Sequence, residues 1–73
     1  MARKVYWVVP SGSLWEVKHE GQVLSRHYTK DAAIDAGRLV AKKNAPSQLR
    51  VLKQDGTFDF EWTYEFDPYP PSG

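Results

Sequence analysis

The chain has 73 residues, ten basic and nine acidic side chains, a formal charge of +1 and no cysteine. So short a chain forms one domain that buries only about 60% of its unfolded surface, which leaves little room for an enclosed catalytic pocket. The lack of cysteine excludes disulfides and thiolate metal sites, and the balanced charge gives no general argument for a polyanionic partner.

Three strands are predicted first, at residues 5–9, 14–19 and 22–28. They are rich in aromatic and β-branched residues and are separated by Gly-containing turn signals. A two-residue turn at 11–12 places Val8 opposite Trp15. A second tight turn then places Leu24 opposite Val17. We therefore expect an antiparallel meander.

A single helix is predicted to follow, from about Lys30 to Lys43. Thr29 is a good N-cap because its hydroxyl can accept a hydrogen bond from an unpaired backbone amide of the first turn. Pro46 prevents the helix from continuing. Small residues form a broad arc on one side, which lets the helix approach a sheet that carries large rings; they are Ala32, Ala33, Ala36, Gly37, Val40 and Ala41.

The stretch from Phe58 to Phe66 alternates aromatic and polar residues without interruption. Because successive strand side chains point to opposite faces, this alternation predicts a strand with five rings on one side. A preceding strand at 48–54 and the signal Asp55-Gly56 predict a hairpin with a two-residue type I′ turn. This pairing sets Val51 against Phe60, Leu49 against Trp62, and Arg50 against Glu61.

The predicted fold is α+β, in the order three strands, helix, two strands, with a twisted antiparallel sheet packed on one helix. We expect one domain over residues 1–73, with a globular core over 1–66 and an extended Pro-rich C-terminal tail over 67–73. The predicted core contains Tyr6, Val8, Trp15, Val17, Leu24, Tyr28, Ala33, Ala36, Val40, Leu49, Val51, Phe60, Trp62 and Tyr64.

Catalytic and metal-binding patterns are not found. The histidines, His19 and His27, are expected on different faces of the paired strands, so we expect no shared metal ion, and no Gly-rich phosphate loop or activated hydroxyl is found. We therefore expect no enzyme activity and no cofactor. No segment has the roughly 20 apolar residues that span a bilayer, and no signal peptide is recognised, so we expect a soluble, cytoplasmic protein.

An apolar patch is predicted on the outward side of the first hairpin. If Tyr6 and Val8 face inward, the residues that face outward are Val5, Trp7, Val9 and Leu14. Such a patch often marks a contact surface, and Trp7, Val9 and Leu14 are the predicted contact residues. Tyr69 in the tail could fold back across the same surface. The patch predicts a protein partner or self-association into a homo-oligomer; the alternative is that the tail or the helix connection covers Trp7.

Nucleic-acid binding is the competing hypothesis. It uses Lys18, Arg26, Lys30 and Arg50, with a three-stranded sheet laid in a major groove and basic side chains on phosphates. The stretch 15–33 is similar to the small sheet-type DNA-binding domains found at the start of many phage integrases. Acidic residues on the docking face would repel phosphate.

The chain as a whole resembles the small bacterial and phage family known as domain of unknown function 2188. The resemblance spans nearly the full length and depends on short motifs in a fixed order: Val8-Val9-Pro10, Trp15-Glu16-Val17-Lys18, Gly21, Thr29, Ala33-Ile34, Ala41-Lys42, Leu49 to Val51, Asp55-Gly56, Tyr64, Asp67-Pro68, Pro70-Pro71 and Gly73. Trp7 stands where a histidine is usual, which enlarges the outward patch. The family implies no established activity, catalytic residue or cofactor, so it leaves the function open.

Overall fold

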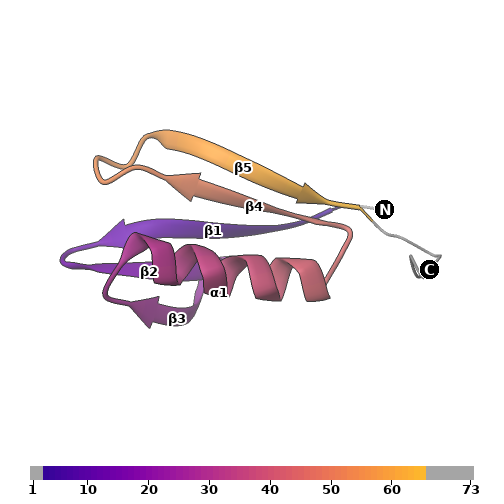
Figure 1. Ribbon diagram of the computed structural model, residues 1–73, viewed down its shortest axis with the longest axis horizontal. Helices are drawn as coiled ribbons and strands as arrows, with labels where there is room; N and C mark the ends of the chain where they lie inside the picture. The colour runs from indigo at the N-terminus through magenta and orange to yellow at the C-terminus, as the bar shows by residue number, and fades with distance from the viewer. Residues whose placement is uncertain (1–2, 66–73) are drawn as a thin grey trace.

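The computed structural model describes residues 3–65, and in this range one five-stranded sheet packs one face against one helix (Figure 1). The predicted order of elements is confirmed. The elements are β1 (Lys4–Ser11), β2 (Leu14–His19), β3 (Gln22–His27), α1 (Lys30–Lys43), β4 (Ser47–Leu52) and β5 (Phe58–Tyr64). The predictions for Tyr69 and the Pro-rich tail lie outside the described residues.

The sheet is mixed, with the strand order β3-β2-β1-β4-β5. Three of the pairings are antiparallel as expected, whereas the central pair of β1 and β4 is parallel. The reason is the helix: a strand, a crossover helix and a second strand in one sheet leave the two strands parallel. Because β3 is parallel to β1, the strand that follows α1 is parallel to both. The parallel direction of β4 could therefore have been predicted from the order strand, helix, strand in the sequence.

The hairpin of β1 and β2 turns one residue later than predicted. Its two-residue loop is Gly12-Ser13, so Val8 pairs with Val17 and Pro10 with Trp15. Gly12 has a φ of 61°, a left-handed conformation that glycine adopts without steric cost. Because the loop lies one residue later, each residue of β1 pairs with the residue of β2 two positions beyond the predicted one. A shift of two residues keeps every side chain on its predicted face.

A β-bulge in β3 makes two core predictions wrong. The register shifts between Val17 and Lys18, which leaves Leu24 as an extra residue on β3. Because of this one extra residue, each side chain of β3 after the bulge points to the face opposite the predicted one. Leu24 is consequently 45% exposed and Tyr28 is 88% exposed, although both were predicted to be buried. Ser25 and His27 take the positions on the side of α1 instead.

A second β-bulge lies at Asp59 in β5. The predicted pairs of Leu49 with Trp62, Val51 with Phe60 and Arg50 with Glu61 are confirmed. Beyond Val51 the register shifts, and Leu52 pairs with Phe58. Phe58 therefore lies on the face of Leu52, away from the helix, and the prediction of five rings on one side is wrong at this position. The bulge interrupts an alternation that the sequence alone shows as continuous.

The loop of this hairpin has three residues, not two. The amide of Lys53 donates to the Thr57 carbonyl (2.7 Å), and the amide of Gly56 donates to the Lys53 carbonyl (2.9 Å). A β-turn followed by a residue with positive φ builds such a loop, and Gly56 supplies a φ of 89°. Thr57 is thus taken out of β5, and the strand begins at Phe58.

Helix α1 begins and ends where the sequence predicts. The Thr29 hydroxyl accepts a hydrogen bond from the Ala32 amide (3.1 Å), which confirms the N-cap. The buried residues of the helix are Ala33, Gly37 and Ala41. An ideal Cβ built on Gly37 would lie 2.8 Å from Leu49 Cδ1, so the helix approaches β4 as closely as glycine allows.

The core lies between α1 and the sheet. Its buried apolar residues are Tyr6, Val8, Trp15, Val17, Ala33, Ala41, Leu49 and Val51, all predicted except Ala41. Trp62 and Tyr64 pack against this core but are only partly buried. Phe60 is 37% exposed, so its predicted burial is wrong. The cause is the position of β5 at the edge of the sheet, where α1 gives it little cover (Figure 1).

Candidate interaction surfaces

The side of the sheet opposite α1, which we call the outer face, carries the predicted apolar patch. Tyr6 and Val8 are buried under α1, so the alternating residues of β1 point the other way. Trp7, Val9 and Leu14 all lie on the outer face, as predicted. Each of the three is half-buried. Among the described elements α1 is the only helix, and it covers the opposite face (Figure 1).

Trp7 lies at the centre of the outer face, between two basic residues on neighbouring strands. It pairs with Lys18 on β2 and with Arg50 on β4. The guanidinium carbon of Arg50 is 5.5 Å from the centroid of the Trp7 ring, within cation–π range. Arg50 Nε is also 3.3 Å from Glu61 Oε1, an ion pair that is not a hydrogen bond. The ring is therefore flanked by positive charge.

The apolar surface continues past Val9 toward the tip of the second hairpin. Val9 and Leu52 follow the paired residues Val8 and Val51 on adjacent strands, so they are neighbours on the outer face. Leu52 in turn pairs with Phe58, which is 53% exposed. Sequence reasoning missed Leu52 and Phe58. Simple alternation after Val51 could have found Leu52, whereas Phe58 is placed there by the bulge at Asp59.

Of the four basic residues of the nucleic-acid hypothesis, three lie on the outer face and the fourth, Lys30, lies on the helix side of the sheet. Lys18, Arg26 and Arg50 are on the outer face, but two of them have acidic partners. Arg26 Nε donates to Glu16 Oε2 at 3.0 Å, and Glu16 is buried at 9% exposure. Lys18 has no ion pair among residues 3–65.

Lys30 lies on the helix side of the sheet, at the first turn of α1. Its ammonium group donates to Asp59 Oδ2 at 2.6 Å, and both side chains are at least two-thirds buried. The same group is 5.5 Å from the centroid of Trp15 and 5.9 Å from that of Phe60. The bulge in β5 turns Asp59 toward the helix and so makes this contact possible. Lys30 therefore ties α1 to the edge strand.

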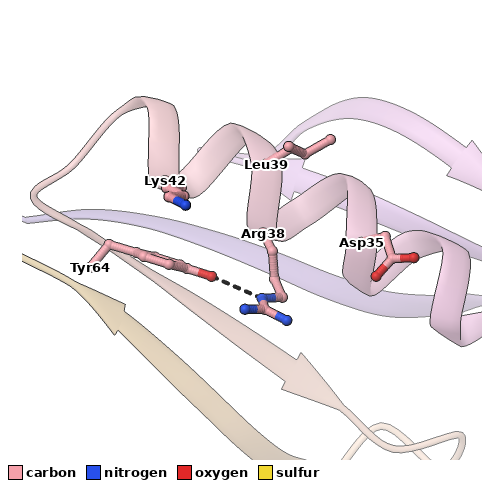
Figure 2. Close-up of a pocket in the computed structure, with 5 residues that line it drawn as sticks. All are labelled: Asp35, Arg38, Leu39, Lys42 and Tyr64. Atoms are coloured by element: carbon pink, nitrogen blue, oxygen red, sulfur yellow. Dashed lines mark hydrogen bonds between the residues drawn. The ribbon is translucent and has the colours of Figure 1, made fainter.

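A shallow depression of about 330 Å³ lies between α1 and the end of β5. Figure 2 shows Arg38 reaching from the helix toward Tyr64, and its Nε donates to the Tyr64 hydroxyl at 3.1 Å. The Arg38 guanidinium also lies 4.7 Å from the centroid of Trp62. The remaining lining residues are Asp35, Leu39 and Lys42. The contacts of Arg38 give the rings of β5 a partial cover at this end.

The two histidines share the helix side of the sheet, contrary to the predicted split. His19 stacks on Tyr6 with ring centroids 4.3 Å apart, and its Nδ1 donates to the Val5 carbonyl. His27 pairs with Trp15 and hydrogen-bonds the Ser25 hydroxyl. The bulge in β3 moves His27 to this face. His19 is the last residue of β2, whereas His27 on β3 pairs with Trp15 near the other end of β2, so the two rings lie far apart along the strand pair. Residues 3–65 hold no group of three His, Asp or Glu able to bind a metal.

Two titratable groups are clearly perturbed. Burial raises the pKa of the Tyr6 phenol, and the Glu20 carboxylate adds to the effect. Hydrogen bonds from the hydroxyl and the amide of Thr57 lower the pKa of Asp55. Both shifts are explained by local structure.

These features define a small α+β domain with a mixed five-stranded sheet, one covered face and one outer face that carries a central tryptophan. The chain belongs to the family described as "Uncharacterized protein conserved in bacteria (DUF2188)", which matches residues 6–64. No curated protein matches the chain, and no solved structure does. Within residues 3–65 no helix is long and apolar enough to cross a membrane.

Proposed function

We propose that the chain is a non-enzymatic interaction domain that binds a partner protein through its outer face. The observation that carries this proposal is the position of Trp7. It occupies the middle of a sheet face over which no described element packs, with Val9, Leu52 and Phe58 extending the apolar surface. Tryptophan at the centre of a surface is typical of the residues that dominate binding energy.

The positive charges around Trp7 indicate which chemical groups a partner would present to this surface. Lys18 and Arg50 flank the ring, and Lys18 has no ion pair among the described residues. A partner that fits would offer an apolar surface for Trp7 and a carboxylate within reach of Lys18. An open depression of about 460 Å³ borders Trp7, and a side chain of a partner protein would fit into it.

The experiment compares two alanine substitutions in partner capture and in self-association. Trp7→Ala removes the central ring. Leu39→Ala is the control, because Leu39 is a helix residue that is 69% exposed and distant from the outer face. Amide chemical shifts, recorded against fractions of a bacterial lysate and at rising protein concentration, should change on the outer face of the unmodified chain. Trp7→Ala should abolish the changes around Trp7, Val9 and Leu52 and Leu39→Ala should not. If Trp7→Ala leaves both partner capture and any self-association through this patch unchanged, the proposal is wrong.

Nucleic acid is the competing partner, and the same preparation tests it. Lys30 is on the other side of the sheet, and Arg26 and Arg50 are paired with carboxylates, so we expect no complex in a gel-shift titration at low salt. A complex whose affinity falls steeply with salt would show counterion release from phosphates and would replace the proposal of a protein partner.

A further inference from the structure

Strand β5 is an edge of the sheet throughout the described residues. Among residues 3–65 nothing pairs with the outward edge of β5, whose backbone amides and carbonyls are a template for a further strand. The bulge at Asp59 lies at the beginning of the strand, so the residues from Phe60 to Tyr64 form an uninterrupted regular stretch. The other edge strand, β3, carries its bulge at Leu24 in the middle of the strand. A bulge in the middle protects β3 from pairing, and β5 has no such protection.

The side of β5 that faces α1 bears three aromatic rings, at every second position of the strand, that are incompletely covered. Phe60 is 37% exposed, and Trp62 and Tyr64 are half-buried. Of the five strands, β5 contacts α1 least, and Figure 1 shows β5 on the far side of β4 from the helix. A strand added to β5 would lay its own side chains beside these rings. Aromatic pairs across neighbouring strands are among the stabilising contacts of a sheet.

The charges of β5 distinguish the antiparallel pairings of the strand with itself that place both helices on one side of the joined sheet. Centring the pairing on Glu61 sets Glu61 against its own copy, and centring it on Thr63 sets Glu61 against Glu65. Centring it on Phe60 sets Asp59 against Glu61. Like charges directly opposite one another destabilise a sheet.

Centring the pairing on Trp62 leaves one like-charge pair, Asp59 against Glu65, at the two ends of the regular stretch. Trp62 then faces its copy, Phe60 faces Tyr64, and Glu61 faces Thr63. Trp62 is also the midpoint of the regular stretch. Asp59 and Glu65 each form a hydrogen-bonded ion pair within their own chain, with Lys30 at 2.6 Å and with Arg3 at 2.9 Å. Glu61 has an ion pair with Arg50 at 3.3 Å, but this pair is not hydrogen-bonded, so Glu61 is the acidic residue that the pairing must keep away from another carboxylate.

We propose that β5 pairs antiparallel with β5 of a second copy of this chain, centred on Trp62. The pair joins two five-stranded sheets into one continuous sheet. Residues directly opposite each other in an antiparallel pair share a face, so both helices lie on one side and both outer faces on the other. The outer face, and with it the proposed partner site, stays free in each copy. The pairing is therefore independent of the proposed function.

Thr63 tests the pairing by charge. Thr63 is exposed and faces Glu61 of the second copy in this register. Thr63→Glu should weaken the dimer and Thr63→Lys should strengthen it, each between about 2-fold and 30-fold in the dissociation constant, because symmetry creates the new pair twice. Gln22→Glu and Gln22→Lys make the same charge changes on the exposed edge of β3 and are the matched controls.

The dissociation constants are measured by sedimentation equilibrium from low micromolar to millimolar concentration, with circular dichroism confirming that every variant folds. Opposite shifts for the two Thr63 variants and none for the Gln22 variants support the pairing. A chain that stays monomeric throughout, or a dimer that both Thr63 variants leave unchanged, overturns it. Trp7→Ala should leave the β5 dimer intact, which separates this result from that of the proposed partner site.

Cysteine pairs test the register. Directly opposed residues have Cα atoms about 4.5–5.5 Å apart, within disulfide reach, whereas diagonal neighbours are about 7–8 Å apart. The chain has no cysteine of its own. An equal mixture of Glu61→Cys and Thr63→Cys chains should therefore oxidise to the mixed dimer in preference to either identical pair. A statistical distribution of the three products would contradict the register centred on Trp62.

Discussion

The tightest contact between the helix and the sheet is at Gly37, and it yields a prediction in which two effects of known sign oppose each other. Replacing glycine by alanine inside a helix normally stabilises it by about 1 kcal/mol. Here the added methyl carbon would lie 2.8 Å from Leu49 Cδ1 and 3.2 Å from Val8 Cγ2. Leu49 and Val8 are both completely buried, so neither can move away into solvent.

The packing effect should win. Adding a methyl group to a filled core costs about 1–3 kcal/mol, so Gly37→Ala should lower the free energy of unfolding by about 1 kcal/mol net. In a domain of this size, that loss lowers the melting temperature by about 4–8 °C. Leu49→Val shortens the side chain that the new methyl would strike. In that background, Gly37→Ala should be neutral or stabilising.

Urea unfolding of the two single variants and the double variant measures the coupling directly. Leu39 gives the control, because it is an exposed helix position: the difference in stability between Leu39→Ala and Leu39→Gly reports helix propensity alone, about 1 kcal/mol. If Gly37→Ala stabilises the unmodified chain by that same amount, the close approach of α1 to β4 is wrong.

Three further predictions concern charged and polar contacts. Lys30→Met leaves Asp59 two-thirds buried without its partner and should cost about 1–3 kcal/mol in urea unfolding; Lys30→Met with Asp59→Asn should recover part of that loss, and equal stability of both variants would contradict the contact. Asp55 holds a lowered pKa, so its stabilising effect is present above its usual pKa of 3.8 and is lost as pH falls through the lowered pKa. Thr57→Ala should raise that pKa toward 3.8 in an NMR titration, and an unchanged value would refute the assigned cause. The raised pKa of Tyr6 means that its stabilising effect is intact below pH 10.0 and falls as pH rises through the raised value. Tyr6→Phe should therefore reduce the alkaline loss of stability, and the same slope with and without the phenol would rule this out.

The order of elements and the helix are fully encoded in local sequence. Thr29 caps the helix, Pro46 follows its end, and the arc of small residues faces the sheet, because these are properties of short segments. The pairing of Leu49 with Trp62 also follows from alternation and a turn signal. The same alternation places Trp7, Val9 and Leu14 on the outer face.

The positions of the two β-bulges could not be predicted from the alternation of apolar and polar residues. A β-bulge adds one residue to one strand, and whether a chain takes it depends on its neighbours: the bulge at Asp59 is accompanied by an ion pair with Lys30, which lies 29 positions earlier in the chain. That contact moves Phe58 to the outer face. The bulge at Leu24 similarly exposes Leu24 and Tyr28. Local periodicity is enough to predict which segments become strands and helix, whereas the face that each ring occupies depends on long-range contacts.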